Sequence, residues 1–363
     1  MSEQDRAHMR HALQLAARGL GRVWPNPAVG CVLVKDGRIV GRGWTQPGGR
    51  PHAERRALDQ AGAAARGATA YVTLEPCAHH GQTPPCAEGL VACGVARVVS
   101  ALEDPDTRVA GKGHAILRAA GIEVEVGLLA DAARTLNHGF LKRTTQGLPM
   151  VTLKLATTLD GRIATASGES RWITGAGSRR AVHLLRMTHD AVMVGSGTAL
   201  ADDPDLTVRD LGAAHQPVRV VVDSGLRHAP DSRLGQTARA HPVWLLHGTG
   251  TDNAGWQATG ARLLECPMGA GALDLRAGLG LLAAQGITRV FCEGGAGLAA
   301  ALIRAGLVDD LVIFSAGALI GEEGRAALGP LALGALADAP RLSLVSQTAV
   351  GGDVMSHWRF VQV

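Results

Sequence analysis

Aromatic residues and clustered positive charge are both scarce in this chain of 363 residues. Phe, Tyr and Trp together make up 3% of it, and the net charge of +4 includes no lysine- or arginine-rich block. Proteins that bind nucleic acid depend on basic patches and on aromatic side chains that stack with bases. We therefore expect no nucleic-acid partner and a small anionic substrate instead, with cores built from Val, Leu, Ile and Ala.

Long apolar segments are also missing. No run reaches the roughly 18 apolar residues that a membrane-spanning helix needs, and residues 1–6 are charged, unlike the start of a secretory signal peptide. Six cysteines in a chain of this length do not make a disulfide scaffold. The sequence thus predicts a cytoplasmic protein that has no membrane partner.

The length of the chain suits two domains of ordinary size. A short helical pattern over residues 131–140 precedes a polar stretch, 141–149, that is punctuated by Gly147 and Pro149. Such a stretch predicts a linker, so we place the domains at 1–145 and 148–363. No repeat of fixed period relates the two halves. The oligomeric state stays open, a homo-oligomer included.

One histidine and two cysteines in the first half form a candidate metal site. His52 opens a helical pattern, Cys77 follows an extended run, and Cys86 opens a second helical pattern. Nitrogen and sulfur ligands suit tetrahedral zinc, and three protein ligands leave the fourth position for water, as in a catalytic site. Helix N-termini favour the thiolate form of cysteine that binds metal.

Glu54 lies two residues after His52. A carboxylate beside a zinc-bound water can take its proton and pass it to a leaving amine, which is the role of the Glu in zinc deaminases. The alternative is a chance His-x-Glu accompanied by cysteines that are only small buried side chains. The His-x-Glu pattern and Cys86 each open a helical pattern, and this combination favours zinc-dependent deaminase chemistry.

The zinc-site pattern departs from the usual Pro-Cys-x-x-Cys ending, because a His-, Gly- and Pro-rich insert separates the two cysteines. With Pro25-Asn26-Pro27-x-Val-Gly upstream, it resembles the deaminase half of the bifunctional riboflavin-biosynthesis deaminase/reductase family, and the similarity covers almost the whole chain. The resemblance implies zinc ligands His52, Cys77 and Cys86, the proton shuttle Glu54, and substrate contacts Asn26 and His79.

Several of these residues also have ordinary structural interpretations. Asn26 between two prolines is typical of a turn, and His79 and His80 are typical of a solvated loop; we leave both histidines off the metal. Thr45 and Gln82 depart from the family pattern, in which many members carry a histidine and a basic residue, respectively. The loop over residues 104–113 is either an ordinary connection or a contributor to substrate binding. It follows an expected strand, and α/β sheets place ligands at the ends of their strands.

A glycine-rich segment, Glu293-Gly294-Gly295-Ala296-Gly297-Leu298, follows an extended run in the second half and opens a helical pattern. Glycines let a backbone approach a ligand, and a helix N-terminus presents free N–H groups to an anion such as pyrophosphate. The segment does not match the dinucleotide fingerprint Gly-x-Gly-x-x-Gly, and a tight turn explains it equally well.

The residues around this segment resemble the reductase half of the same family, whose fold is similar to dihydrofolate reductase and whose hydride donor is NADPH. The matching runs are 168–173, 184–186, 197–198 and 201–209. By position, the resemblance implies cofactor contacts at Ala156, Trp172, Thr198, Asp202, Ser224, Gly294, Gly295, Ala296 and Gly297, and substrate contacts at Ser170, Arg186, Leu206, Arg209 and Glu293. A solvated helix face for Arg186, a turn for Asp202 and a core position for Trp172 are the structural alternatives.

The expected fold class is α/β in both domains: a cytidine-deaminase-like three-layer αβα domain, then a dihydrofolate-reductase-like α/β domain. We expect a helix over 8–20, a hairpin of strands 29–34 and 38–43, and strands at 70–74, 97–101 and 122–126. In the second half, strands are expected at 150–156, 191–195, 218–223, 243–247 and 289–293. Segments 311–315, 342–345 and 354–358 are expected to add antiparallel edges.

The function that follows is a two-step conversion of a small phosphorylated pyrimidine. The first domain hydrolyses an exocyclic amine with zinc, and the second reduces the ribosyl group to a ribityl chain with NADPH. Lys154, Asp202 or Glu293 would stabilise or protonate the reacting sugar. The rival interpretation is a nucleic-acid or nucleoside deaminase whose second domain is not catalytic.

Overall fold

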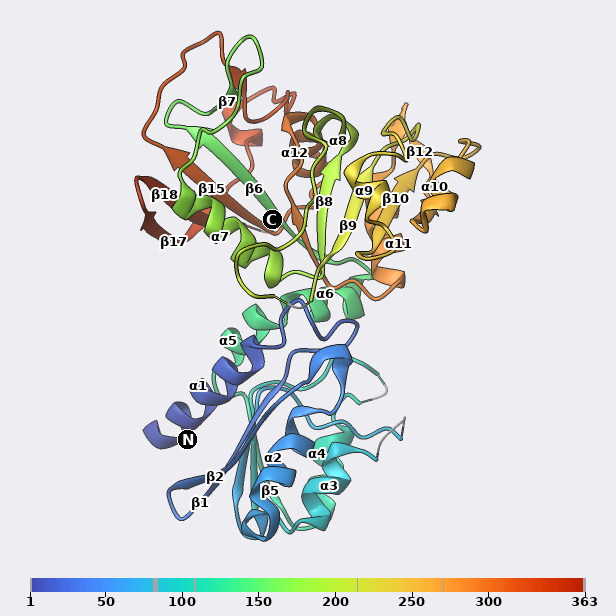
Figure 1. Ribbon diagram of the computed structural model, residues 1–363. Helices are drawn as coiled ribbons and strands as arrows, with labels where there is room; N and C mark the ends of the chain where they lie inside the picture. Colours follow the sequence, from blue (N-terminus) through green and yellow to red (C-terminus); the bar gives the residue numbers. More distant parts are fainter. Residues whose placement is uncertain (1, 81–83, 108, 214, 270, 362–363) are drawn as a thin grey trace. The chain divides into compact units, whose positions relative to one another are not determined.

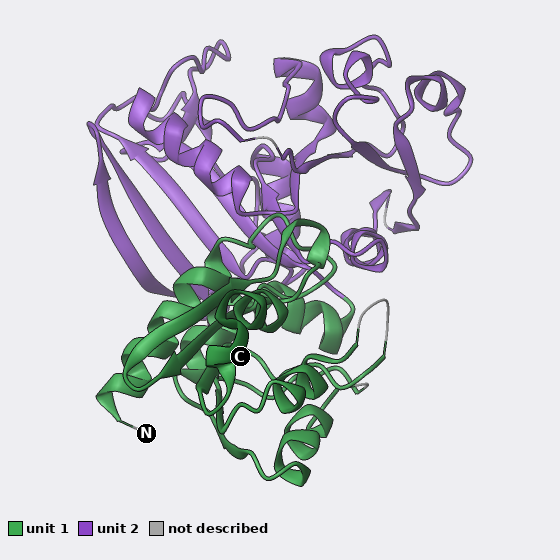
Figure 2. Ribbon diagram, turned by 60° about the horizontal axis from the view of Figure 1, so that its bottom comes forward, with its two compact units in different colours: residues 1–147 green, residues 148–363 purple. Residues whose placement is uncertain are grey.

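The structure, a computed structural model, describes residues 2–80, 84–107, 109–213, 215–269 and 271–361. The chain forms two compact units, residues 1–147 and 148–363 (Figures 1 and 2). Within the described residues, none of the helices combines the length and the apolar character needed to cross a lipid bilayer.

The first unit is built on a sheet of five strands in the order β2-β1-β3-β4-β5. Strand β1 is antiparallel to its neighbours β2 and β3, whereas β3, β4 and β5 are mutually parallel. The strands are β1 (Gly30–Lys35), β2 (Arg38–Trp44), β3 (Thr69–Val72), β4 (Arg97–Ser100) and β5 (Glu123–Val126). The expected hairpin forms, with its turn at Asp36 and Gly37.

Helices cover both faces of this sheet. They are α1 (Glu3–Ala17), α2 (Ala53–Ala61), α3 (Cys86–Ala92), α4 (Lys112–Ala119), α5 (Ala130–Leu136) and α6 (His138–Gln146), with short 3-10 turns Pro47–Gly49 and Gly62–Ala65. A Cβ on Gly30 would lie 1.9 Å from the Ala12 carbonyl of α1, and one on Gly43 would lie 2.0 Å from the Ala53 carbonyl of α2. Gly30 and Cys31 are consecutive in β1, so they point to opposite faces of the sheet. Gly43 pairs with Cys31 and therefore faces the same side as Cys31, which puts α1 and α2 on opposite faces. The arrangement is therefore the expected three-layer αβα sandwich.

Two sequence predictions in this unit are wrong. Helix α1 begins at Glu3 and not at residue 8, because Ser2 caps it: Ser2 Oγ accepts from the Asp5 backbone N–H at 3.1 Å, and the Asp5 carboxylate accepts from the Ser2 N–H at 2.6 Å. The expected polar linker, 141–149, is helical as far as Gln146. Lys142 is buried in that helix, so tertiary packing outweighs its polar composition.

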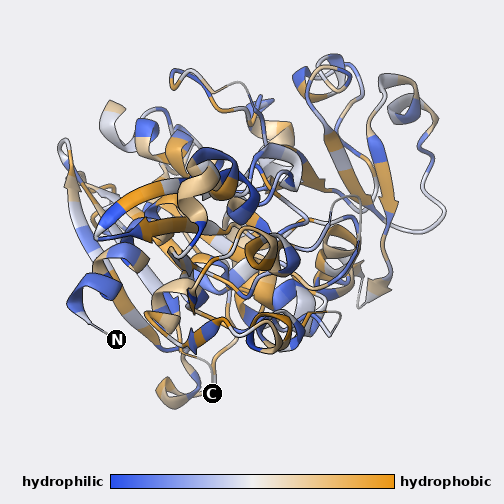
Figure 3. Ribbon diagram, turned by 90° about the horizontal axis from the view of Figure 1, so that it is seen from below, coloured by the Kyte–Doolittle hydropathy of each residue, from blue (hydrophilic) through white to orange (hydrophobic). Residues whose placement is uncertain are grey.

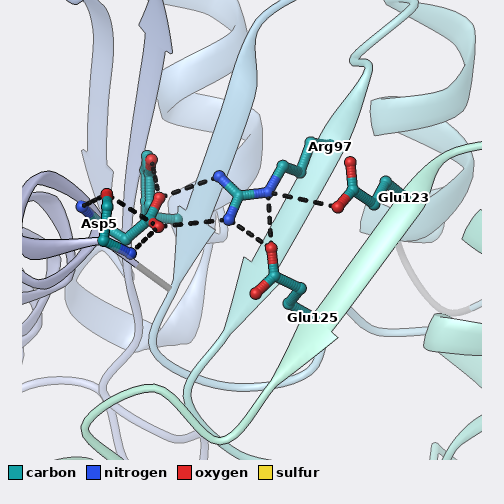
Figure 4. A network of polar contacts seen from close by, with 6 residues as sticks. Asp5, Arg97, Glu123 and Glu125 are labelled. Atoms are coloured by element: carbon teal, nitrogen blue, oxygen red, sulfur yellow. Dashed lines mark hydrogen bonds and ion pairs between the residues drawn. The ribbon is translucent and has the colours of Figure 1, made fainter.

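A network of charged side chains, in which Asp5 is buried, ties α1 to the sheet (Figure 4). Arg97 on β4 donates to Asp5 at 2.9 Å, also contacts Glu125, and lies 3.8 Å from Glu123. The hydroxyl of Tyr71 donates to Asp5 at 2.7 Å. The bond from Arg97 is the main cause that holds the pKa of Asp5 well below its ordinary value. The first helix is thus anchored by a carboxylate that stays ionised.

The second unit is built on a sheet of nine strands in the order β11-β10-β9-β8-β14-β6-β15-β18-β17. These are β6 (Met150–Thr158), β8 (Ala191–Gly195), β9 (Val218–Val222), β10 (Val243–His247), β11 (Arg262–Glu265), β14 (Arg289–Cys292), β15 (Asp310–Ala316), β17 (Leu342–Val350) and β18 (Asp353–Phe360). Neighbours from β11 to β15 are parallel, and β18 and β17 are antiparallel additions. The prediction of an antiparallel edge is therefore right for β17 and β18 but wrong for β15, which lies parallel to β6 inside the sheet.

Helices also cover both faces of the larger sheet. The helices of this unit are α7 (Ala176–Met187), α8 (Ser196–Asp202), α9 (Arg233–Gln236), α10 (Ala254–Thr259), α11 (Leu275–Ala284) and α12 (Ala296–Arg304). Two small sheets pair β7 (Arg162–Ala164) with β16 (Arg325–Ala326) and β12 (Met268–Gly269) with β13 (Ala272–Leu273). Residues Leu336–Asp338 form a 3-10 turn. Leu245 packs with α7, α9 and α10, whereas its neighbour Leu246 faces Gly278 of α11. Apolar segments in orange are common among the strands of Figure 3, and many turns are blue.

Candidate active sites

The three predicted metal ligands lie together at one end of the first sheet. His52 is the residue before α2, Cys77 follows β3, and Cys86 is the first residue of α3. His52 Nδ1 is 3.6 Å from Cys77 Sγ and 3.4 Å from Cys86 Sγ, and all three ligand atoms lie within 4.8 Å of one another. In a tetrahedral zinc site the usual bond lengths put N and S ligands about 3.5 Å apart. The three side chains therefore fit zinc.

The two cysteines differ in their electrostatic surroundings. The pKa of Cys77 is lowered to about 4, chiefly because its sulfur accepts a hydrogen bond from the Cys86 thiol, and the Cys86 backbone N–H also donates to it at 3.2 Å. The same contact with Cys77, followed by burial, raises the pKa of Cys86. A metal ion binds both sulfurs as thiolates, and the Cys77 sulfur is the more readily ionised of the two.

Glu54 lies in the first turn of α2, and its side chain is buried. Burial raises the pKa of this carboxyl to about 7, with a further contribution from the charge of Cys77. A hydrogen bond joins it to Cys86, so it faces the ligand cluster. A buried carboxyl that exchanges a proton near neutral pH suits general acid/base chemistry.

A second group, Glu75, Glu103 and His114, also brings metal-type ligand atoms together. The Glu75 carboxylate, however, already accepts three backbone N–H groups, from Asp104 at 3.2 Å, Gly111 at 3.0 Å and His114 at 3.2 Å. These bonds fasten Asp104, Gly111 and the start of α4 to the segment that carries Cys77, and a Cβ on Gly113 would lie 2.0 Å from the Pro76 carbonyl. Sequence reasoning missed this positioning role, because a single Glu before Pro-Cys carries no separate signal.

The remaining residues predicted for this site are placed as follows. Asn26 is half-buried, and its side chain lies against Gly49 of the turn Pro47–Gly49. His79 is half-buried, and its Nδ1 is buried with no hydrogen-bond partner among the described residues. Thr45 is fully inside, where its hydroxyl accepts from the Val29 N–H at 3.0 Å. Gln82 lies outside the described residues.

The second unit has two adjoining hollows at the carboxyl ends of its parallel strands, of about 1040 Å³ and about 510 Å³. Both are lined by Lys154, Ala156, Ile163, Ser170, Arg171, Thr198, Asp202 and Glu293. The larger is also lined by the glycine-rich segment, and the smaller by Trp172, Arg186, Leu206 and Arg209. Ligands bind at this edge of α/β sheets.

The glycine-rich segment forms the expected strand-to-helix turn. Gly295 precedes α12 without a side-chain cap, so the first N–H groups of that helix are presented to the larger hollow. The Gly295 N–H itself donates to Thr198 Oγ1 at 3.1 Å. A Cβ on Gly294 would lie 2.7 Å from a methyl of Leu298. The turn therefore fits a pyrophosphate approached closely by backbone, as in NADPH.

Three charged side chains meet where the hollows join. Arg186 Nε and Nη2 donate to the two carboxylate oxygens of Glu293 at 2.5 and 3.1 Å, and Lys154 Nζ lies 3.9 Å from that carboxylate. Burial alone would raise the pKa of Glu293, but Arg186 and Lys154 lower it overall. Burial lowers the pKa of Lys154, against the opposing charge of Glu293. Lys154 and Glu293, two of the three residues predicted to act in the reductase, thus share one buried site.

Other predicted residues differ in their surroundings. Trp172 is 71% exposed, not a core residue, and the Arg179 guanidinium lies 4.7 Å from its ring centre. Asp202 is exposed and lies 3.9 Å from Arg171. Leu206 is buried with a positive φ of 56°. Ser224, two residues beyond β9, lines neither hollow.

Sequence reasoning missed several residues that line the smaller hollow. Arg179 and His183 come from α7, and Arg233 opens α9. The Arg209 backbone N–H donates to His183 Nδ1 at 3.3 Å. Each is a single polar residue in a helical pattern, so no local motif distinguishes it from a solvated side chain. The fold alone gathers this positive charge, which suits a phosphate.

Comparisons with known proteins assign each unit to a described family. Residues 2–102 match the cytidine and deoxycytidylate deaminase zinc-binding region, and residues 149–356 match the RibD C-terminal domain. The chain is 47% identical to the riboflavin biosynthesis protein RibD of Escherichia coli K12, over 98% of this chain and 99% of that one. It is 46% identical to the Haemophilus influenzae protein of that name, over 97% and 96%.

Solved structures agree over the full length. Acinetobacter baumannii RibD, form 1, has a TM-score of 0.90 at 41% identity and covers 99% of both chains. A Thermotoga maritima diaminohydroxyphosphoribosylaminopyrimidine deaminase/5-amino-6-(5-phosphoribosylamino)uracil reductase has a TM-score of 0.87 at 33% identity, again over 99% of both. These similarities confirm the expected fold class in both halves.

Proposed function

The chain belongs to the RibD family of riboflavin biosynthesis proteins, and from this membership we propose how its residues divide the work. It is a bifunctional enzyme, a zinc-dependent deaminase followed by an NADPH-dependent reductase. Residues 1–145 deaminate 2,5-diamino-6-(5-phosphoribosylamino)pyrimidin-4-one, and residues 148–363 reduce the ribosyl group of the product to a ribityl chain. The observation that carries this proposal is the fit of His52, Cys77 and Cys86 to tetrahedral zinc beside a buried Glu54.

In the deaminase, His52, Cys77 and Cys86 hold the metal, and Glu54 moves the protons. Zinc supplies the Lewis acidity that makes a water nucleophilic near neutral pH. The Glu54 carboxylate takes a proton from that water and delivers it to the exocyclic nitrogen, so that ammonia leaves and oxygen replaces it on the ring. Asn26 and His79 contact the pyrimidine; the Nδ1 of His79, which is buried and has no partner among the described residues, supports this role.

In the reductase, the segment Gly294–Gly297 binds the pyrophosphate of the cofactor, with further contacts from Ala156, Trp172, Thr198, Asp202 and Ser224. NADPH supplies hydride to the carbon exposed when the ribose opens to an imine. Lys154, Asp202 and Glu293 stabilise or protonate the sugar, and the buried contact between Lys154 and Glu293 supports the first and last of these.

The substrate contacts are assigned to the smaller hollow. Ser170, Leu206, Arg209 and Glu293 line it, and Arg186 holds Glu293 in place while facing the same space. The positive charge gathered there suits the phosphate of the substrate. This arrangement favours a small phosphorylated pyrimidine over the polynucleotide that a nucleic-acid deaminase would require.

We also propose a cytoplasmic homo-oligomer. All six cysteines are free thiols, which suits a reducing compartment. The edge strand β17 is exposed along most of its length, and its Leu344 and Val345 are 52% and 47% exposed. A long exposed edge invites pairing with another chain. Light scattering coupled to size exclusion should give a mass of at least two chains; a single-chain mass would contradict the oligomer.

The two activities are tested separately on the purified full chain. Metal analysis should find one zinc per chain, ammonia should be released from the diaminopyrimidine, and NADPH should be oxidised when the deaminated product is supplied. A protein that performs only one of the two steps would contradict the bifunctional assignment and identify the inactive half.

A further inference from the structure

NADPH differs from NADH by one phosphate, carried on the 2′-oxygen of the adenosine ribose. We propose that Arg227, together with Ser196, binds this 2′-phosphate and so selects NADPH; the inference rests on the proposed cofactor site. No sequence motif assigns the role, because Arg227 lies in an irregular segment after β9.

The order of strands fixes which end of the hollow holds the adenosine. Strands β6, β14, β8 and β9 are consecutive neighbours, and each contributes to the larger hollow: Lys154 from β6, Gly294 after β14, Ser196 after β8, and Val222 from β9. Adjacent strands are about 4.8 Å apart, so β6 and β9 are separated by about 14 Å. A dinucleotide with its reactive ring at Lys154 and its pyrophosphate at Gly294 must direct its adenosine towards β8 and β9.

Arg227 lies beside that end. Its Nη2 donates to Ser196 Oγ at 2.6 Å, and its Nε lies 3.3 Å from Asp223 Oδ1. The side chain is 61% exposed, and its contacts with Asp223 and Ser196 use Nε and Nη2 and leave Nη1 out. Two N–H groups beside a hydroxyl are well shaped to grip a phosphate.

The Asp223 carboxylate, directly after β9, is not available to bind the ribose of NADH. In sheets that bind NAD, an acidic residue near such a strand end accepts a hydrogen bond from the ribose 2′-hydroxyl. Asp223 is buried, with a side-chain exposure of 1%; one oxygen contacts Arg227 and the other accepts from the His228 N–H at 2.9 Å. It is therefore engaged within the protein, and Arg227 presents the charge at this end.

Two of the other cations of the larger hollow lie at its β6 end. Lys154 is on β6 next to Glu293, whereas Arg171 lies 3.9 Å from Asp202, the last residue of α8. Arg325 is paired with Ala164 of β7, the strand that follows β6, and its guanidinium lies 3.0 Å from the Cβ position of Gly168. Lys154 and Arg325 thus stand away from β9, and Arg171 lies beside the carboxylate at the last residue of α8, whereas Ser196 is the first residue of that helix. Arg227 is the cation best placed for the 2′-phosphate.

The test compares dinucleotide binding, read from nucleotide fluorescence, to the zinc-loaded full chain and its Arg227→Gln variant. Loss of charged hydrogen bonds should raise the Kd for NADPH about 10- to 100-fold, while the Kd for NADH changes less than about twofold. 2′,5′-ADP should lose affinity and 5′-AMP should not. Arg239→Gln, an exposed arginine that donates to Ala258, should leave every Kd unchanged.

Three results would overturn the inference. The first is an equal loss of NADPH and NADH affinity in Arg227→Gln, which would mean that Arg227 only supports the fold. The second is unchanged preference in that variant combined with lost preference in Arg325→Gln, which would move the phosphate to the other end. The third is a wild-type chain that binds neither dinucleotide, which would refute the proposed reductase itself and is distinguishable from the first two.

Discussion

Replacing Arg186 with methionine tests whether the buried charge cluster of the second unit is held by this guanidinium. The substitution removes the bonds of 2.5 and 3.1 Å to Glu293 and a third, at 2.8 Å, to the Thr207 carbonyl. Breaking a buried ion pair costs about 3–5 kcal/mol. Lys154 remains 3.9 Å from the carboxylate and offsets part of the loss, so we expect a decrease of about 3 kcal/mol in the free energy of unfolding.

Urea unfolding, followed by circular dichroism, measures this change, and Arg180→Met is the matched control. Arg180 is an exposed arginine on the same helix, so its loss should cost less than about 0.5 kcal/mol. Because the pKa of Glu293 is lowered in the folded chain, its contribution is present above the ordinary carboxyl pKa and is lost as pH falls through the lowered value. The difference between wild type and Arg186→Met should therefore shrink in acid. Equal free energies of unfolding for wild type and Arg186→Met at pH 7 would refute the reasoning.

Three further predictions concern the first unit. Cys77→Ser should abolish stoichiometric zinc in metal analysis and stop ammonia release, whereas oxidation of NADPH on the deaminated product continues. Asp5→Asn should lower the free energy of unfolding by about 1–3 kcal/mol in urea; since the pKa of Asp5 is lowered, the deficit should be full above about pH 4 and fade as pH falls further. Gly30→Ala places a Cβ 1.9 Å from the Ala12 carbonyl, so it should lower the free energy of unfolding by at least the usual cost of overpacking, about 1–3 kcal/mol, and calorimetry should show a lower melting temperature.

Strands with clear alternation or apolar runs were predictable from the sequence. Val243–His247 forms as expected, and the hairpin turns at Asp36 and Gly37. Pairing was harder, because the residues of β15 give no sign of which strand will lie beside them. Strand β17 extends to Val350 and not only to residue 345, since polar residues are tolerated on an exposed edge. The capping of α1 by Ser2 uses Asp5 where Glu or Gln is more usual, which hides the signal.

The candidate sites were predictable where a local motif exists. His52, Cys77 and Cys86 are recognisable because ligand type and helix position coincide, and the glycine-rich segment because a strand precedes it. Glu75 and Arg227 were not, since their contacts with Gly111 and Ser196 join segments that are distant in sequence. Arg179 was not, since only the folded chain places it at the smaller hollow. Only the folded chain shows which isolated charges meet.

The most direct test of the account is ammonia release by a zinc-loaded Glu54→Gln variant. The glutamine keeps the size of the side chain but cannot carry a proton between water and the leaving amine. We expect one zinc per chain, as in wild type, and a rate of ammonia release lower by about 10²- to 10⁴-fold. Full-speed release with zinc bound would contradict the assignment of Glu54 as the proton carrier.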